Sequence, residues 1–480
     1  MNSLSSPLLA KVAATVQRYA LFKPNDSVVV ACSGGPDSLS LLGVLREFSE
    51  SFPLQLTAVY VDHGLRSEAA DEGRFVCSVA NKLGLPALVQ KVSVDLKHSP
   101  GESVQVAARR ERYRLLEEVA KATGSCCIAT GHTADDQAET VLLRILRGTG
   151  SQGLAGIPYI NGRLRRPLLD ARRADTEQYC RLWGVEPRRD PSNEEDVYLR
   201  NQIRHHIVPL LTGINPRLVE ALCRLAETTQ TEQEWFECLL ADKADQFACR
   251  LDGGWWLYTN RLAQQHKAWQ RRLVRWYYKD LQNNVTGQEL DFEHVEALLE
   301  LVIQGRTGAS LSLPNELVAH KEKNGLWLGA PVVAANYEVP LSVPGVTPIP
   351  GTDLAIVTAI LEGTMPTQSE LQEEPTVEEA VGPWQPQSRS EYVDYDSLQG
   401  SLKVRNWRAG DRYQPLGLVG TKKLQDMLVD AGIPRRWRLR LPVMSDAAGI
   451  VWAAGARPAE RVKVNSGSSR LLQIKLVISN

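Results

Sequence analysis

The chain has 480 residues, 43% of them hydrophobic and 23% charged, and its formal net charge at pH 7 is −1. This length allows about three domains, and the near-zero charge excludes a protein that binds polyanions over its whole surface. The sequence contains neither a run of about 18 apolar residues, which would predict a transmembrane helix, nor a signal-peptide pattern. With eight cysteines and no C-x-x-C pair, we expect a cytoplasmic protein with reduced thiols rather than a zinc knuckle or an iron–sulfur cluster.

The first 160 residues alternate short β-branched runs with amphipathic segments of helical period. This alternation predicts an α/β domain with a doubly wound parallel sheet, which we place at residues 1–214. The expected strands are Val28–Ala31, Leu56–Val61, Leu88–Val92 and Cys127–Thr130, and the expected helices are Leu39–Phe48, Ala69–Leu83 and Ser103–Lys121.

The turn after the first expected strand consists of small residues, S-G-G-P-D-S at 33–38. Without bulky side chains, several backbone N–H groups can converge there on an anion, and the next helix directs the positive end of its dipole to the same point. Phosphate is the expected ligand, although the spacing matches neither the Walker P-loop nor the G-x-G-x-x-G dinucleotide turn. Because Mg²⁺ prefers carboxylate and phosphate oxygens, we predict that Asp37 binds Mg²⁺.

A second group of polar residues follows the fourth strand, in T-G-H-T-A-D-D-Q-A-E at 130–139. In parallel sheets, ligands bind at the carboxyl ends of the strands. Asp136 and Glu139 lie three residues apart and therefore share one face of a helix. With His132 and Asp135 beside them, they are candidate ligands for a metal ion or an amine-bearing substrate. The alternative is that these carboxylates only stabilise the start of a helix.

Two weaker signals complete the first domain. V-D-H-G-L-R at 61–66 ends the second strand and adds Asp62 and His63 as candidate nucleotide contacts. A-A-R-R-E-R-Y at 107–113 places Arg109 and Arg112 on one helical face, where they either contact phosphate or form a solvated basic surface.

Beyond residue 214 the pattern changes. Apolar residues recur at helical spacing in Leu218–Ala226, Trp235–Ala248 and Trp269–Leu281, which predicts a mainly helical, tRNA-contacting domain at 215–330. Residues 331–390 are interpreted as a linker or insertion, whose proline-containing acidic part at 361–390 is expected to be flexible.

The last segment, 391–480, contains short β-like runs and predicts a small α+β domain with a basic surface. Residues 403–440 carry ten Lys or Arg and three Asp, a net charge of +7, and residues 163–189 carry eight Arg and four acidic residues. Such local charge suits RNA. Trp407, Tyr413 and Trp437 lie among these charges and either stack on a base or pack in the core.

The string S-G-G-P-D-S resembles the signature of the PP-loop, or N-type ATP pyrophosphatase, superfamily. Taken with VDHGLR, ARRERY, GHTADDQAET and RGTGSQGLAGI in this order, it resembles the tRNA(Ile)-lysidine synthetase family. LRNQIRHHIVPLL at 199–211 and the segment 408–443 extend the resemblance over most of the chain, although it thins in the helical middle.

This resemblance implies a ligase that joins free lysine to C2 of the wobble cytidine of tRNA(Ile) with anticodon CAU. ATP would adenylylate the C2 oxygen with release of pyrophosphate, and the lysine amine would then displace AMP. The resemblance implies that ATP and Mg²⁺ are bound by Ser33, Gly34, Gly35, Pro36, Asp37, Ser38, Asp62 and His63, and that catalysis involves Asp37, Arg109, Arg112, His132, Asp136 and Glu139.

Two alternatives stay open at this point, and the oligomeric state, a dimer being one option, stays open too. A PP-loop tRNA 2-thiolase would need a cysteine pair or an iron–sulfur cluster, for which Cys77, Cys126 and Cys180 are the candidates. A non-catalytic, ATP-dependent RNA-binding protein would release no pyrophosphate in response to tRNA and lysine.

Overall fold

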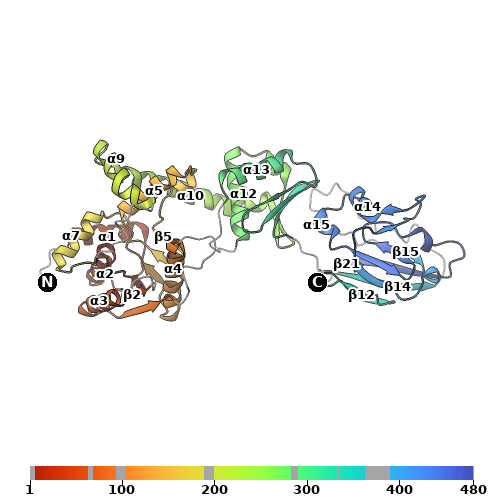
Figure 1. Cartoon of the computed structure of the whole chain (residues 1–480), viewed down its shortest axis with the longest axis horizontal. Helices are drawn as coiled ribbons and strands as arrows, with labels where there is room; N and C mark the ends of the chain where they lie inside the picture. The colour runs from red at the N-terminus through yellow and green to blue at the C-terminus, as the bar shows by residue number, and fades with distance from the viewer. Residues whose placement is uncertain are drawn as a thin grey trace. The chain divides into compact units, whose positions relative to one another are not determined.

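The computed structural model describes residues 6–62, 69–92, 104–188, 199–282, 290–331, 336–362 and 390–478. The chain forms two compact units, Met1–Glu237 and Cys238–Asn480, which are coloured from red to blue along the chain in Figure 1. Within the described ranges, no helix combines the length and the apolar character needed to cross a membrane.

The first unit is built on a six-stranded sheet with the order β3-β2-β1-β4-β6-β5. All of its strands run parallel except β5, which pairs antiparallel with β6. The predicted parallel sheet is therefore confirmed, and its four predicted strands occur within one residue at each end. The strands are β1 (Ser27–Ala31), β2 (Gln55–Asp62), β3 (Ala87–Lys91), β4 (Cys127–Ala129), β5 (Ile160–Asn161) and β6 (Leu164–Arg165).

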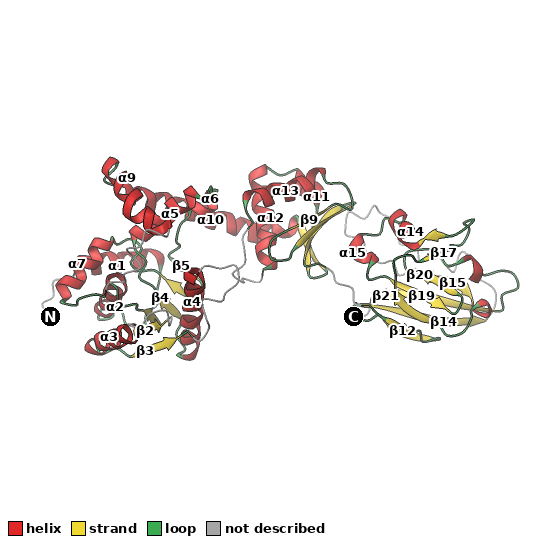
Figure 2. Cartoon of the chain, in the orientation of Figure 1, coloured by secondary structure: helices red, strands yellow, loops and turns green. Residues whose placement is uncertain are grey.

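Alternate residues of β1 belong to two different hydrophobic cores. Val28 and Val30 pack with α1 and α2 on one face of the sheet, whereas Val29 packs with α4 on the other face. A β-branched run without polar alternation is what a strand covered on both faces requires. Figure 2 shows the helices around this sheet, which are α1 (Pro7–Tyr19), α2 (Pro36–Phe48), α3 (Ala69–Lys82), α4 (Val104–Ala122), α5 (Ala134–Leu146), α6 (Ser151–Leu154) and α7 (Arg173–Trp183).

A second group of helices follows α7. It comprises α8 (Leu199–Gln202), a π-helical turn (Ile203–Ile207), α9 (Val208–Ile214) and α10 (Leu218–Lys243). Val219, Leu222 and Ala226 of α10 form one apolar cluster with residues of α5. Because this face of α10 is buried against α5, the first compact unit extends to Glu237 and includes helical residues beyond the predicted catalytic domain, 1–214.

The middle part of the chain contains an antiparallel sheet that the sequence analysis did not predict there. Its strand order is β7-β8-β11-β10-β9. The helix expected up to Ala248 ends at Lys243, and the chain from Ala248 forms a hairpin of β7 and β8. The tight turn of this hairpin consists of Asp252 and Gly253, both with positive φ. The elements are β7 (Ala248–Leu251), β8 (Gly254–Leu257), α11 (Thr259–Ala263), α12 (Lys267–Leu281), α13 (Phe292–Gln304), β9 (Ser310–Ser312), β10 (Val318–Glu322) and β11 (Gly325–Gly329).

The last part of the chain combines two four-stranded sheets, β12-β16-β19-β20 and β13-β14-β21-β15. Three of these strands come from the segment 331–390, so its first half is sheet rather than linker; its acidic part, 363–389, lies outside the described residues. The elements are β12 (Glu338–Pro340), β13 (Gly345–Pro348), β14 (Leu354–Glu362), β15 (Ser390–Asp394), β16 (Lys403–Asn406), β17 (Arg412–Tyr413), β18 (Lys422–Lys423), α14 (Leu424–Asp430), α15 (Arg435–Arg438), β19 (Pro442–Asp446), β20 (Gly449–Ala453) and β21 (Arg470–Ile478).

Arg436 of α15 joins the two parts of the second unit. Its side chain is 2% exposed, its Nε lies 2.6 Å from Glu322 Oε1 on β10, and it also pairs with Asp252 in the β7–β8 turn. The guanidinium lies within 6.0 Å of the ring centres of Trp256 and Trp327. A buried charge with two carboxylate partners fixes the position of α15 against the middle sheet.

Candidate functional site

The loop between β1 and α2 leaves backbone N–H groups available to an anion. Ser38 Oγ accepts a hydrogen bond from the Ser33 N–H (3.1 Å) and donates one to the Gly35 carbonyl (3.0 Å), which closes the loop on itself. Gly34 has φ +84°, a conformation that favours glycine. The N-cap of α2 is Gly35, and no side chain caps the helix. No side chain therefore occupies the N-terminus of α2, where an anion could meet the N–H groups of its first turn; the predicted phosphate contact stays a prediction.

The segment after β4 lies directly against this loop. A Cβ atom added to Gly131 would lie 3.0 Å from the backbone carbon and oxygen of Asp37 and 3.2 Å from the backbone nitrogen of Ser38. A side chain at this position would push the loop back by a few tenths of an ångström, and glycine thus allows the close approach that brings the polar residues 132–139 next to the phosphate-binding loop.

Asp37 stands at the junction of the two segments. Its Oδ1 accepts a hydrogen bond from the Thr176 hydroxyl, and its Oδ2 lies 3.7 Å from Arg173 Nε. Burial raises the pKa of Asp37 to about 6, and the nearby Asp136 carboxylate acts in the same direction. A carboxylate that is partly desolvated and faces a second carboxylate favours a cation, so the residues present fit Mg²⁺.

Asp136 and Glu139 share one face of α5, as predicted, and both are paired with arginines. Glu139, which is 2% exposed, contacts Arg173 (3.5 Å), Arg200 (3.1 Å) and Arg204 (2.7 Å). The same three guanidiniums reach Asp136 Oδ1 at 3.4, 3.1 and 3.6 Å. We call these two carboxylates and three arginines the carboxylate–arginine cluster.

The three arginines of this cluster are site residues that were not predicted from the sequence. Arg173 lies in the Arg-rich stretch 163–189, which was interpreted as an RNA-binding surface. Arg200 and Arg204 lie in the segment LRNQIRHHI, and their spacing of four residues was a signal that one helical face carries two cations. The π-helical turn that contains Arg204 is a distortion that occurs frequently at functional sites.

The alternative role of the aspartates, stabilising helix ends, is also present. Asp136 Oδ2 accepts a hydrogen bond from the Thr133 N–H (2.9 Å) and so caps α5. Asp135 lies apart from the cluster, because its oxygens accept hydrogen bonds from the Arg173 N–H (2.7 Å) and the Arg172 side chain (3.1 Å). Asp135 therefore ties α5 to the start of α7.

His132 lies next to the carboxylate–arginine cluster. Its Nδ1 is 3.0 Å from the Thr130 hydroxyl. Burial lowers the pKa of His132 to about 3. Arg166, Arg109 and Arg200 also lower this pKa, whereas the Asp136 carboxylate raises it. The imidazole is therefore neutral near pH 7 and only weakly basic, and the low basicity favours hydrogen bonding over proton abstraction.

The predicted arginines of α4 are exposed at this side of the domain. Arg109 Nη2 donates to the Tyr113 hydroxyl (3.2 Å) and is close enough to His132 to affect its pKa. Arg112 is also exposed. Arg166, which the sequence analysis did not single out, is 4% exposed and donates to the Pro158 carbonyl.

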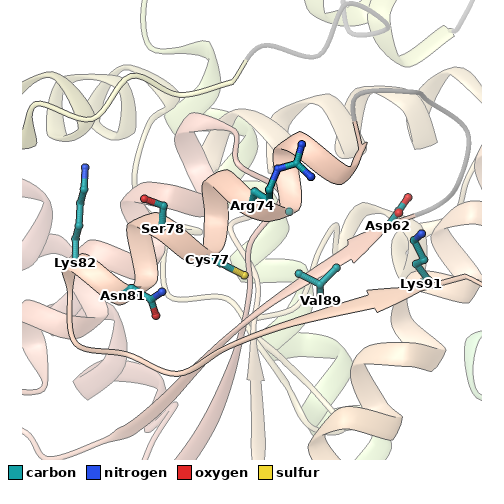
Figure 3. A pocket seen from close by; sticks show the side chains of 9 residues that line it. Asp62, Arg74, Cys77, Ser78, Asn81, Lys82, Val89 and Lys91 are labelled. Carbon is teal, nitrogen blue, oxygen red and sulfur yellow. The ribbon is translucent and has the colours of Figure 1, made fainter.

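Asp62 lies at the end of β2, opposite Lys91 of β3 (Figure 3). It lines a cavity of about 810 Å³ whose other lining residues all come from α3 and β3, among them Arg74, Cys77 and Lys82. Its predicted contact with nucleotide stays a prediction, and His63 lies outside the described residues.

The three cysteines considered for a thiolase do not form a cluster. Cys180 Sγ lies 3.5 Å from the Pro36 carbonyl, next to the phosphate-binding loop, whereas Cys126 Sγ lies 3.4 Å from the Ser27 carbonyl at the opposite end of β1. Cys77 lines the cavity between α3 and β3. Of these three cysteines, Cys180 alone lies at the loop.

The chain is similar to known proteins over most of its length. A family model described as "PP-loop domain" matches residues 7–211, one described as "TilS substrate binding domain" matches 257–327, and one described as "TilS substrate C-terminal domain" matches 402–475. The tRNA(Ile)-lysidine synthase of Caldanaerobacter subterraneus subsp. tengcongensis is 34% identical, over 98% of this chain and 97% of that protein. The enzyme of the same name from Geobacillus kaustophilus is 33% identical, over 98% of this chain and 100% of that protein. A solved structure titled "Crystal structure of TILS C-terminal domain" is 29% identical and covers 30% of this chain and 99% of its own, with a TM-score of 0.24.

Proposed function

The chain belongs to the tRNA(Ile)-lysidine synthase family, and on that premise we propose how its residues carry out lysidine formation on tRNA(Ile). The reaction is a carbon–nitrogen ligation that joins lysine to C2 of the wobble cytidine in a CAU anticodon. The observation that carries this proposal is the convergence of the PP-loop, Asp37 and the carboxylate–arginine cluster at the carboxyl ends of β1 and β4.

The PP-loop domain binds ATP. In the proposed first step, the C2 oxygen of cytosine attacks the α-phosphate, and the bond to pyrophosphate breaks. The loop 33–38 holds the leaving pyrophosphate through backbone N–H groups and the N-terminus of α2. Asp37 would hold Mg²⁺, which supplies positive charge to the phosphates when it is bound.

In the second step, lysine replaces AMP at C2. The ε-amine has a reference pKa of about 10.4, so it must lose a proton before it attacks. Asp136 and Glu139 are the proposed partners of the lysine ammonium group. The ammonium group would replace one arginine of the cluster as the ion-pair partner of these two carboxylates. An arginine released in this way can turn to the phosphates, because guanidinium binds carboxylate and phosphate with the same geometry.

The basic surface proposed for tRNA contains fewer free charges than the sequence suggests. Of the ten basic residues in 403–440, six form ion pairs with carboxylates. The other four, for which no ion pair occurs among the described residues, are Arg412, Lys423, Arg435 and Arg438. We propose that these positions contact tRNA phosphates, which position the RNA without reading its bases.

One assay tests the proposed function. The full chain is incubated with ATP, Mg²⁺, labelled lysine and total tRNA, and the tRNA is then digested to nucleosides. We expect one lysine-labelled nucleoside, formed only with ATP and only on the tRNA with anticodon CAU. A sulfur-containing nucleoside, or the absence of any lysine-labelled nucleoside, would contradict the proposal. The proposal also includes a cytoplasmic location, which cell fractionation tests, and a dimer, which gel filtration tests.

A further inference from the structure

Three potential metal ligands come together in the first unit, outside the site described above. Asp26, Cys126 and Cys127 bring a carboxylate oxygen and two sulfur atoms within 4.8 Å of one another. Cys127 Sγ lies 3.6 Å from Cys126 Sγ and 3.9 Å from Asp26 Oδ2. Over the described ranges of the chain, this is the one group of three or more His, Cys, Asp or Glu side chains with such close ligand atoms.

The group lies at the end of the sheet opposite the phosphate-binding loop. Asp26 precedes β1, Cys126 precedes β4, and Cys127 is the first residue of β4. The two strands are parallel neighbours, with Val28 opposite Cys127. The PP-loop leaves the carboxyl end of β1, so a ligand of this group would contact none of the proposed catalytic residues.

The distances suit a tetrahedral ion with thiolate ligands. Zn–S bonds of about 2.3 Å and Zn–O bonds of about 2.0–2.2 Å place two sulfurs about 3.8 Å apart and a sulfur and an oxygen about 3.5 Å apart. The observed 3.6 Å and 3.9 Å differ from these separations by a few tenths of an ångström. Cys126 is exposed and Cys127 is 3% exposed, so the ion would have a path from solvent and a buried anchor.

A disulfide fits the same atoms less well. Adjacent Cα atoms are about 3.8 Å apart, which is below the usual range of about 4.4–6.8 Å for disulfide-bonded cysteines. Without an ion, burial raises the pKa of the Cys127 thiol to about 12, and Arg165 acts against this shift. With two thiolates, one carboxylate and a divalent ion, the net charge of −1 would be balanced by the Arg165 guanidinium.

We propose that Asp26, Cys126 and Cys127 form a Zn²⁺ site that links the amino ends of β1 and β4. The site completes its tetrahedron with a water molecule, because Cys126 borders solvent. Its role is structural: it joins the two central strands of the catalytic unit at the end where no loop chemistry takes place.

The test uses the full-length chain, purified with a reductant and freed of metal by a chelator, and titrated with Co²⁺ as a spectroscopic substitute for Zn²⁺. We expect a sulfur-to-cobalt charge-transfer band that saturates at one equivalent and disappears when Zn²⁺ is added. Cys126→Ser and Asp26→Asn should each weaken binding at least about tenfold. Cys238→Ser, which removes an exposed thiol on α10, is the matched control and should leave the band unchanged.

A second readout separates the site from a folding defect. Zn²⁺ should raise the melting temperature of the wild-type chain and of Cys238→Ser, and should leave that of Cys126→Ser unchanged, although all three are folded without metal. The proposal is overturned if the charge-transfer band is absent, or if Cys126→Ser retains it with wild-type affinity. Neither result depends on lysidine formation, so the site and the proposed function are tested separately.

Discussion

Replacing Asp37 by asparagine should stabilise the ligand-free protein while it abolishes turnover. In the folded chain, burial raises the pKa of this carboxyl group to about 6, from an ordinary value of 3.8. In the unfolded chain the group ionises near its ordinary value, so between about pH 4 and 6 the folded state binds more protons. Stability therefore falls as the pH rises through this window, and it stays lower above pH 6.

The size of the effect follows from the shift. About two pKa units at 1.36 kcal/mol each give about 3 kcal/mol of unfavourable free energy at pH 7.5. Asparagine has the same shape, can still accept the Thr176 hydrogen bond and carries no charge to desolvate. Some of the gain is lost with the Arg173 contact, so we expect Asp37→Asn to be more stable by about 1–3 kcal/mol.

Urea unfolding monitored by hydrogen exchange of β1 measures this difference, without ATP or Mg²⁺, at pH 7.5 and at pH 4. Glu186→Gln, an equal change of charge at an exposed position, is the control and should have little effect at either pH. The reasoning is refuted if Asp37→Asn is no more stable than the wild type at pH 7.5, or if its advantage grows as the pH falls. Pyrophosphate release at a normal rate by this variant would remove Asp37 from the mechanism.

Three further predictions concern the two units. Asp136→Asn should raise the lysine concentration at half-maximal rate by about tenfold, the loss of one charged hydrogen bond, with little change for ATP; a selective loss of ATP affinity would assign this carboxylate to the metal. Arg436→Met should cost about 3–5 kcal/mol in urea unfolding of the second unit, because Glu322 keeps a buried charge, whereas the exposed neighbour substitution Arg435→Met should cost little. Arg412→Ala should lower the salt dependence of tRNA binding by about one unit of slope, measured by filter binding over a salt series, and an unchanged slope would exclude a phosphate contact.

The strands of the catalytic sheet are predictable because local sequence determines them. β1 (SVVVA) is a β-branched run buried on both faces, the pattern typical of a central strand in a parallel sheet. By contrast, β14 is paired over its full length with β21, from Leu354 opposite Ile478 to Glu362 opposite Arg470. A partner more than 100 residues away leaves no local signal, so this segment was interpreted as a linker.

The candidate site was predictable in its carboxylates and less so in its arginines. Asp136 and Glu139 follow a strand end and share a helical face, two features that the sequence displays directly. Arg173 reaches them only because α7 packs beside α2 and directs one side chain toward Asp37. A basic stretch has no periodicity that distinguishes a surface charge from one that turns inward.

Because Glu139 pairs with three arginines, the order in which residues of this site can be substituted during evolution is restricted. A lineage that loses one of the arginines keeps a carboxylate with two cationic partners, and the fold survives the step. A lineage that loses Glu139 first leaves Arg173, Arg200 and Arg204 repelling one another with Asp136 as their shared counter-ion. Substitutions at the arginines therefore have to come before any substitution of the glutamate. Among homologues that have lost part of this cluster, we expect the glutamate to be retained with fewer arginines.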